Sequence, residues 1–304
     1  MLEQAEPTTV ELVTRYNEIV AEVQDSSRSA DSNPEVQEKE LYRFKVLCRS
    51  GLGERITKSR SGILSQQLAS PWKSPGGLQL GEETDAGVLV DESLGAYMAL
   101  IQARESDKPE RVVHIILGGV GLELLADVIL SSYLLESNLA TKIVLQPKAI
   151  PFGMESTAED LKSLLSFLVA SSERVSQQQQ QSPDTRHVNC LRLQQRIQDL
   201  FDQGKMVLRP NTVWSNPMTG CDFGVRYPDL CEELKAAELV VVKGDFLYRK
   251  FLADVSIREL HTVLTYPSSL ASTVRHVCGE RANLSSSVTV ALYYAFQDCS
   301  RPFG

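Results

Sequence analysis

Apolar residues near the start of the chain return every three or four positions, as they do on one face of a helix. This spacing predicts a first helix that begins near Thr8 and ends near the polar run 25–34, and a second helix over 35–49. Residues 50–84 are rich in glycine, serine, lysine and proline and show no period, which predicts a long connection or lid. We therefore expect a helical amino-terminal segment and linker over residues 1–84.

From residue 86 onward, short apolar runs alternate with longer amphipathic stretches. The strands are expected at 86–90, 112–117, 142–146 and 238–242, with helices over 93–104, 122–136 and 157–172 between them. Strands that are apolar on both faces and alternate with helices are typical of a parallel sheet covered on both sides. We predict an α/β core domain over 85–304. It should have a doubly wound, three-layer α/β/α fold with a mostly parallel, Rossmann-like sheet.

The polar segment 171–187 interrupts this alternation. It contains the glutamine run 177–181 and no apolar period, a composition typical of a solvated loop or linker. We expect an exposed loop here, with a recognition segment as the alternative. The sequence does not indicate what the glutamine run does.

Composition and charge exclude several classes of protein. No run approaches the 18 apolar residues of a membrane span, and a net charge of -8 disfavours binding to nucleic-acid phosphates or anionic lipid. We therefore expect a small-molecule substrate and neither a nucleic-acid nor a membrane partner. The first residues carry no targeting pattern and the six cysteines form no C-x-x-C pair, so we expect a cytoplasmic protein with reduced thiols. The sequence leaves the oligomeric state open.

The strand predicted at 112–117 ends in the pair Gly118–Gly119 and runs directly into a helix. Backbone N–H groups at such a junction bind phosphate in dinucleotide-binding proteins. Here the last glycine of the G-x-G-x-x-G pattern is replaced by Leu124, and the next strand ends in Gln146 rather than an acidic residue. We interpret the junction as a tight turn and keep nucleotide binding as the alternative.

Four motifs that start at this strand end share a further similarity. They are "LGGVGLELLAD" (117–127), "KIVLQPKAIPF" (142–152), "AELVVVKGDFLYRK" (237–250) and "TVRHVCGE" (273–280). In order and spacing they resemble motifs of the metal-dependent damage-control phosphatases, also described as acidic-residue methyltransferase-like proteins. The resemblance covers residues 86 to 280 and implies the fold and ligand pocket of that family.

The positions that the resemblance assigns to metal ligands have changed in this chain. The family holds a magnesium or manganese ion with an Asp-Asn pair and a later Asp, and the matching residues here are Gly118, Gly119 and Ser156. A hard divalent ion needs several oxygen ligands, usually with one or two carboxylates, and Glu155 alone does not restore such a set. We therefore expect no metal ion and no other cofactor. Ordinary phosphatase activity is not expected either, because the ion stabilises the developing negative charge.

Charged residues remain at other positions that the resemblance places around the pocket. The substrate-binding candidates are Lys148, Lys243, Arg249, Lys250 and Arg275, and the catalytic candidate is Asp245. Lysine and arginine bind carboxylates and phosphates through charge-assisted hydrogen bonds, and a partly enclosed aspartate beside cations suits a general acid or base. A structural ion pair or a solvated charge is the alternative for each.

These observations predict a repurposed, metal-independent enzyme that acts on a small organic anion. Lyase, cyclase, isomerase or acyl-transfer chemistry is expected, of the kind used in specialised metabolism. Three alternatives stay open: a non-catalytic binding or regulatory pseudoenzyme, a residual metal-dependent phosphatase acting on sugar phosphates, and a transferase that uses aminoacyl-tRNA. The acidic balance of the chain disfavours the last.

Overall fold

The computed structural model describes most of the α/β core and two amino-terminal helices. The described residues are 6–26, 34–50, 93–106, 108–178, 185–217, 223–244, 246–247, 250 and 289–293. The strand expected at 86–90 and nearly all of the connection expected at 50–84 lie outside them.

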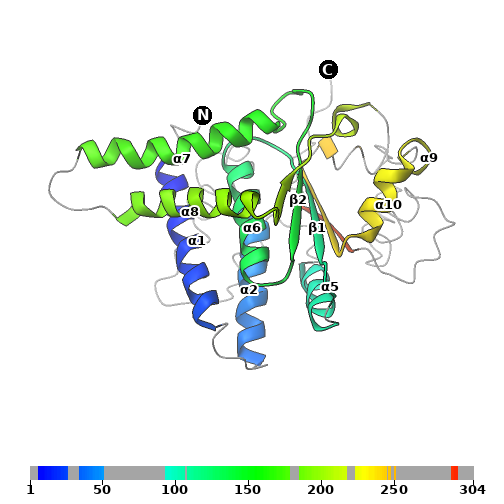
Figure 1. Ribbon diagram of the computed structural model, residues 1–304, viewed down its shortest axis with the longest axis horizontal. Helices are drawn as coiled ribbons and strands as arrows, with labels where there is room; N and C mark the ends of the chain where they lie inside the picture. The colour runs from blue at the N-terminus through cyan, green and yellow to red at the C-terminus, as the bar shows by residue number, and fades with distance from the viewer. Residues whose placement is uncertain are drawn as a thin grey trace, which may run out of the picture.

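The described residues include five strands, which form one parallel sheet in the order β3-β2-β1-β4-β5. The strands are β1 (Val112–Ile116), β2 (Lys142–Gln146), β3 (Met206–Leu208), β4 (Leu239–Lys243) and β5 (Thr289–Tyr293). The chain adds β2 and β3 on one side of β1 and then β4 and β5 on the other (Figure 1). This reversal of direction is the Rossmann-like, doubly wound order, so the predicted fold class is confirmed.

The sheet is covered by helices on both faces (Figure 1). The described helices are α1 (Glu6–Ser26), α2 (Pro34–Ser50), α5 (Ser93–Glu105), α6 (Leu122–Glu136), α7 (Ala158–Gln178), α8 (Thr185–Asp202), α9 (Phe223–Arg226), α10 (Pro228–Ala236) and the short 3-10 helix η3 (Thr212–Ser215). Helices α1, α2, α5, α6, α7 and α8 contribute to a large apolar cluster, whereas η3 and α10 contribute to a smaller one. No helix among the described residues is long and apolar enough to cross a membrane.

The period of two along the strands divides the core between these two clusters. In β1, Val113 and Ile115 belong to the large cluster, whereas Ile116 belongs to the smaller one with Trp214. Successive strand residues point to opposite faces, so a strand buried on both sides must be apolar at nearly every position. The apolar runs in the sequence therefore follow from the three-layer architecture.

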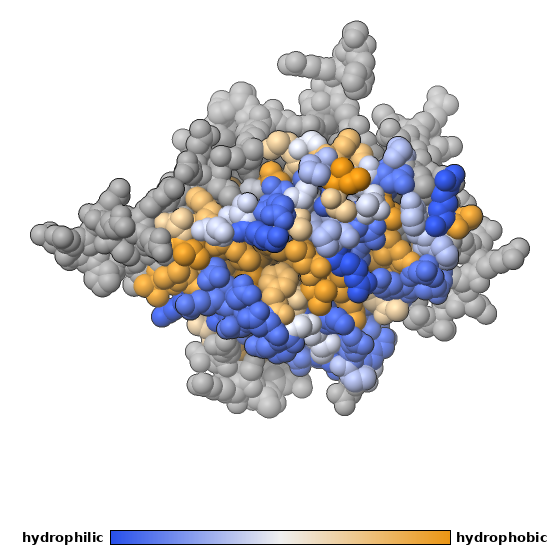
Figure 2. Space-filling view, turned by 45° about the horizontal axis from the view of Figure 1, so that its top comes forward, coloured by the Kyte–Doolittle hydropathy of each residue, from blue (hydrophilic) through white to orange (hydrophobic). Residues whose placement is uncertain are grey.

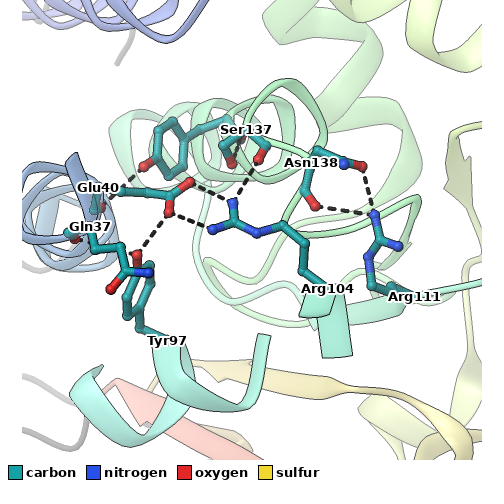
Figure 3. Close-up of polar contacts among 8 residues, drawn as sticks. Gln37, Glu40, Tyr97, Arg104, Arg111, Ser137 and Asn138 are labelled. Atoms are coloured by element: carbon teal, nitrogen blue, oxygen red, sulfur yellow. Dashed lines mark hydrogen bonds and ion pairs between the residues drawn. The ribbon is translucent and has the colours of Figure 1, made fainter. Parts of the chain in front are cut away.

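A group of polar contacts attaches helix α2 to the core (Figure 3). Two nitrogens of Arg104 donate to the Glu40 carboxylate at 2.9 and 3.1 Å, and the Tyr97 hydroxyl donates to it at 2.8 Å. The Tyr133 hydroxyl donates to the Glu40 carbonyl at 3.2 Å. We call Glu40, Tyr97, Arg104 and Tyr133 the Glu40 cluster. These bonds join α2 to α5 and α6, and residues of α1, α2 and the sheet belong to one apolar cluster. The predicted domain boundary between residues 84 and 85 stays a prediction.

The prediction of a loop over residues 171–187 is wrong at both ends of that range, where the structure has helices. Helix α7 continues to Gln178 and α8 already begins at Thr185; residues 179–184 lie outside the described part of the chain. Glutamine is a good helix former, so a polar run rich in it does not by itself end a helix. Helix α8 and strand β3 were not predicted. By contrast, the helix over 122–136 and the strand over 142–146 have the predicted bounds.

Candidate functional site

The candidate site lies where the carboxyl ends of β1 and β4 meet. At this point the order of the sheet reverses, because β1 leads through α6 to β2 on one side while β4 lies on the other. Ligands of open parallel sheets bind in the crevice outside such a switch point. We call the residues around Gly118, Gly119, Lys243 and Gly244 the switch-point site.

Two glycines allow the backbones of β1 and β4 to approach closely at this site. A Cβ atom added to Gly118 would lie 2.9 Å from the carbonyl oxygen of Lys243 and 2.4 Å from Oε1 of Glu123. Gly244 has a φ of +90°, and a Cβ added there would lie 3.3 Å from the Gly118 Cα. Glycine is therefore required by packing at position 118, two residues beyond the end of β1.

The segment after β2 folds back over the end of β1. Gly119 and Glu155 form an antiparallel bridge, and the backbone N–H of Val120 donates to the Met154 carbonyl at 3.1 Å. The backbone N–H and the hydroxyl of Ser156 both donate to the Gly118 carbonyl, at 2.7 and 2.8 Å. The Ser156 side chain, at the position matched to a metal ligand, is therefore buried and used in holding this segment to β1.

Two buried lysine–carboxylate pairs lie at the site. Nζ of Lys148 is 2.5 Å from Oε2 of Glu155, and it also donates to the Leu117 carbonyl at the end of β1. Nζ of Lys243 is 3.0 Å from Oδ1 of Asp127. All four of these charged side chains are buried. Ions removed from water in this way require an opposite charge nearby, and each lysine has one.

Burial shifts the pKa values of several of these groups. Burial raises the pKa of Asp127 to about 6, against the opposing effect of the Lys243 charge. Burial lowers the pKa of Lys148, although Glu155 acts in the other direction. For Lys243, burial is outweighed by the carboxylates of Asp127 and Glu123, so its pKa is raised. Lys243 is therefore protonated at neutral pH, and Asp127 titrates closer to neutrality than an ordinary aspartate.

The buried carboxylates at the site have few hydrogen bonds. Among the described residues, Oδ2 of Asp127 has no hydrogen-bond partner, while Oδ1 of Asp127 lies 3.0 Å from the Lys243 ammonium group and Oε2 of Glu155 lies 2.5 Å from that of Lys148. Buried polar atoms without hydrogen bonds are uncommon in folded proteins. Their presence here, at the switch point of the sheet, marks this as the candidate functional site.

The structure shows where only some of the predicted site residues lie, and the roles of all six stay predictions. Lys148 and Lys243 lie at the carboxyl ends of the central strands β2 and β4. Lys250 is also buried and donates to the Asn216 carbonyl. The other three candidates, Asp245, Arg249 and Arg275, lie outside the described residues, and their roles stay predictions.

Three carboxylates of the site were not among the predicted site residues: Glu123, Asp127 and Glu155. A signal for two of them is present in the sequence. Glu123 and Asp127 are four positions apart in the otherwise apolar start of α6, so both lie on the same face of that helix. Glu155 gives no such signal, since it reaches Lys148 only because the segment after β2 folds back.

The residues at the matched positions do not fit a divalent metal ion. Gly118 and Gly119 have no side-chain oxygens, and the Ser156 hydroxyl is already hydrogen-bonded to a carbonyl. Among the described residues, no group of three or more His, Cys, Asp and Glu side chains is arranged to hold a metal. We therefore derive no chemical step through an ion, and the absence of a metal stays a prediction.

Comparison with known proteins identifies a family and several relatives. The family described as "Damage-control phosphatase ARMT1-like domain" matches residues 62–277, which is more than half of the chain. Damage-control phosphatase ARMT1 from Macaca fascicularis is 26% identical over 254 residues, which cover 83% of this chain and 52% of the relative. The Homo sapiens protein of the same name is 30% identical over 154 residues, 50% of this chain and 32% of the relative. The one from Xenopus laevis is 24% identical over 257 residues, which cover 83% of this chain and 52% of the relative.

The chain thus spans about half, or less, of the length of the curated relatives it matches. The motifs around β1, β2 and β4 lie within the residues that match the family. The chain therefore belongs to the damage-control phosphatase ARMT1-like domain family.

Proposed function

We propose that this chain is a metal-independent member of its family that binds a small organic anion at the switch-point site and acts on it by acid–base chemistry. One observation carries the proposal. Where the matched metal ligands would stand, the chain has Gly118, Gly119 and a hydrogen-bonded Ser156, and the charges beside them are buried lysine–carboxylate pairs. The positive charge at the end of β1 then comes from lysine ammonium groups instead of an ion.

Reactions that move a proton between substrate and protein suit such a set of groups. Lyase, isomerase and cyclase steps need an acid or base with a pKa near the working pH, and acyl transfer also requires proton transfer. Lys250 has a pKa lowered to about 8 by burial and by the charge of Lys148, so its acid form can donate a proton near neutrality. Asp245, next to Gly244, is the proposed partner acid or base. A role in specialised metabolism and a cytoplasmic location are parts of the same proposal.

A non-catalytic binding or regulatory role is the second candidate, and a specific observation favours it. Both lysines at the strand ends are paired with carboxylates of the chain itself, so their charges are largely neutralised internally. A catalytic site usually directs such charges at the substrate. A pseudoenzyme that kept the pocket and lost the reaction has no such requirement.

Metal analysis tests the first part of the proposal. Protein purified from manganese-supplemented medium is analysed for bound elements, and its melting temperature is measured with magnesium, manganese, cobalt and nickel. We expect far less than one ion per chain and no rise of several degrees with any of the four. A stoichiometric ion that is lost in Glu155→Gln would overturn the proposal and return a phosphatase with a rearranged metal site.

Metabolite comparison separates catalysis from binding. Hosts that express the wild type, Asp245→Asn, or the exposed control Lys162→Ala are compared by untargeted mass spectrometry. A product that is present with the wild type and the control but absent with Asp245→Asn supports catalysis. Identical metabolites in all three hosts and in an empty-vector host support the pseudoenzyme.

A further inference from the structure

Three polar side chains form a buried chain of hydrogen bonds on the face of the sheet that η3 and α10 cover. On the surface that Figure 2 shows, hydrophilic side chains lie around hydrophobic ones. His114 in β1, Gln146 in β2 and Trp214 in η3 are instead buried. Nε1 of Trp214 lies 2.9 Å from Oε1 of Gln146, and Nε2 of Gln146 lies 2.7 Å from Nδ1 of His114. We call these three residues the His114 relay.

The chemistry of the three groups fixes the direction of each hydrogen bond in the relay. The indole N–H of Trp214 can only donate, so the Gln146 oxygen accepts from it and the Gln146 amide nitrogen faces His114. That amide nitrogen can only donate as well, so Nδ1 of His114 accepts and carries no proton. The relay therefore requires a neutral imidazole with its proton on Nε2.

Protonation of His114 is incompatible with this set of hydrogen bonds. An imidazolium carries protons on both ring nitrogens, so its Nδ1–H and the Gln146 amide nitrogen would be two donors facing each other. Rotation of the Gln146 amide by half a turn removes that conflict, but it then presents the amide nitrogen to the Trp214 N–H. Either arrangement leaves a buried donor without an acceptor, which is unfavourable.

The charged groups around His114 do not compensate for this loss. Nε2 of His114 lies 3.7 Å from Oε1 of Glu233 in α10, but the same oxygen is already paired with Nη1 of Arg209. Burial lowers the pKa of His114 to about 4, and the positive charges of Arg209 and Lys142 act in the same direction. The neighbour of His114 in β4 is the apolar Val240. The imidazole is therefore neutral at neutral pH and takes up a proton only in acid.

Trp214 connects the relay to the segment that covers the switch-point site. The backbone of Asn211, which caps η3, exchanges two hydrogen bonds with residues 147–149, at 3.1 and 3.3 Å. The Ser215 hydroxyl donates to the Ile150 carbonyl at 3.0 Å. Trp214 lies between these attachments in the sequence, and its ring is buried in the smaller apolar cluster. A shift of Trp214 therefore moves the contacts that support this segment.

We propose that the His114 relay is an acid-sensitive latch for the switch-point site. While the imidazole is neutral the latch is closed, and Trp214 holds η3 against residues 147–150. Uptake of a proton from solvent at Nδ1 of His114 breaks one hydrogen bond of the relay, and the contacts between η3 and residues 147–150 then open more often. The latch depends on neither the reaction nor the ligand, so it stands or falls separately from the proposed function.

The tautomer of His114 tests the closed latch in the wild type. Nitrogen-15 NMR of histidine-labelled protein at about pH 8 should show an unprotonated Nδ1 and a protonated Nε2. The His114 signal is identified by its nuclear Overhauser effects to Val144 and Val240, which lie opposite it in β2 and β4. This measurement requires neither acid nor a variant, and a proton on Nδ1 would overturn the proposal.

Hydrogen exchange of backbone amides measures the opening of the latch. Peptides that cover residues 147–150 and 211–216 are compared between about pH 7 and pH 5, after correction for the intrinsic exchange rate. Because the protonated fraction of His114 grows about tenfold for each pH unit by which pH falls toward its folded pKa, protection should fall by up to about tenfold per unit. A peptide from α6, which belongs to the large apolar cluster, should show no such trend.

A variant that cannot take up the proton separates the latch from general acid unfolding. The side-chain oxygen of His114→Asn is attached to Cγ, as Nδ1 is, so it can still accept from Gln146, but it does not titrate. The dependence of protection on pH should therefore disappear at residues 147–150 and 211–216. Far-UV circular dichroism verifies that the variant is folded over the same pH range.

Removal of the indole donor gives a second test that is independent of the first. In Trp214→Phe the Gln146 amide is free to rotate and accept from a protonated His114, so the pKa of His114 should rise by about one unit or more. Leu230→Ala is the matched control, because it loosens the same apolar cluster without removing a hydrogen bond of the relay. Histidine NMR signals followed against pH give both values.

Two further results would overturn the inference. One is protection that falls with pH in His114→Asn as steeply as in the wild type, which would assign the opening to other groups. The other is a pKa of His114 that changes equally in Trp214→Phe and Leu230→Ala, which would make burial alone responsible. If His114→Asn does not fold, the tautomer and the Trp214→Phe titration still decide.

Discussion

The Glu40 cluster holds half-buried charged groups and the switch-point site fully buried ones, and the two satisfy them differently. In the Glu40 cluster the carboxylate receives two hydrogen bonds from Arg104 and one from Tyr97 (Figure 3). In the switch-point site Asp127 is completely buried; Nζ of Lys243 lies 3.0 Å from its Oδ1, and its Oδ2 has no hydrogen bond among the described residues. A fully bonded ion pair positions the elements that carry it, whereas an incompletely bonded one can respond to a ligand or a proton.

The location of the two groups agrees with this difference. Arg104 also donates to the carbonyl of Ser137, which precedes β2, so the Glu40 cluster lies toward the amino ends of the strands. The switch-point site lies at the carboxyl ends, where parallel sheets bind ligands. Charge held away from water therefore does not by itself indicate function, and the informative feature is incomplete hydrogen bonding at the switch point.

Removal of Lys243 should have the largest effect on stability. Lys243→Ala leaves the carboxylate of Asp127 buried without its counter-charge, which costs about 3–5 kcal/mol of unfolding free energy. Urea denaturation measures the loss. The neutral double variant Lys243→Met with Asp127→Asn should recover most of it, and a double variant as unstable as Lys243→Ala would show that the pair is needed for packing instead.

In the Glu40 cluster, unlike the Lys243–Asp127 pair, neutralising both partners should lower the unfolding free energy. Glu40→Gln with Arg104→Met removes the three hydrogen bonds that Arg104 donates, two to Glu40 and one to the Ser137 carbonyl, and should cost about 2–4 kcal/mol, because Tyr97 also loses its charged acceptor. The same urea titration compares this double variant with the one at the switch point. Equal costs for the two would contradict the distinction between a structural and a functional cluster.

A methyl group at Gly118 should destabilise the close approach of β1 and β4. Gly118→Ala places a Cβ 2.9 Å from the backbone of Lys243, and overpacking of this kind costs about 1–3 kcal/mol. Gly95 is the matched control, because a Cβ there meets no atom within 4 Å and alanine favours helix α5. Thermal unfolding of both variants checks the prediction, and a neutral Gly118→Ala would show that the approach is relaxed in solution.

Ionisation of Asp127 with rising pH should produce the smallest of these effects on stability. Burial raises its folded pKa to about 6 from the ordinary 3.8, so its contribution to stability is fully present below pH 3.8 and is lost as pH rises through 6. Relative to Asp127→Asn, the wild type should lose stability on the order of 1 kcal/mol per pH unit between these values. Lys243, with its raised pKa, stays protonated throughout. Parallel pH profiles of the two proteins would contradict the prediction.

Much of the fold could be predicted because it depends on local patterns. The run "KIVLQ" is apolar at its three central positions, as the middle of a strand buried on both faces must be, and the predicted and observed bounds agree. Helix α8 was missed because its polar start resembles a loop, although Cys190, Leu193 and Ile197 follow a helical period and are buried. Strand β3 has three residues, which is too short for a period to be visible.

Residue type and spacing along the chain were enough to predict the parallel sheet, a strand that ends near Leu117 and the absence of side-chain oxygens at Gly118 and Gly119. The pairing of Glu155 with Lys148 and of Asp127 with Lys243 became visible only in the folded chain. Such pairs join segments whose separation is set by the backbone path and by side-chain packing, and no local pattern contains that distance.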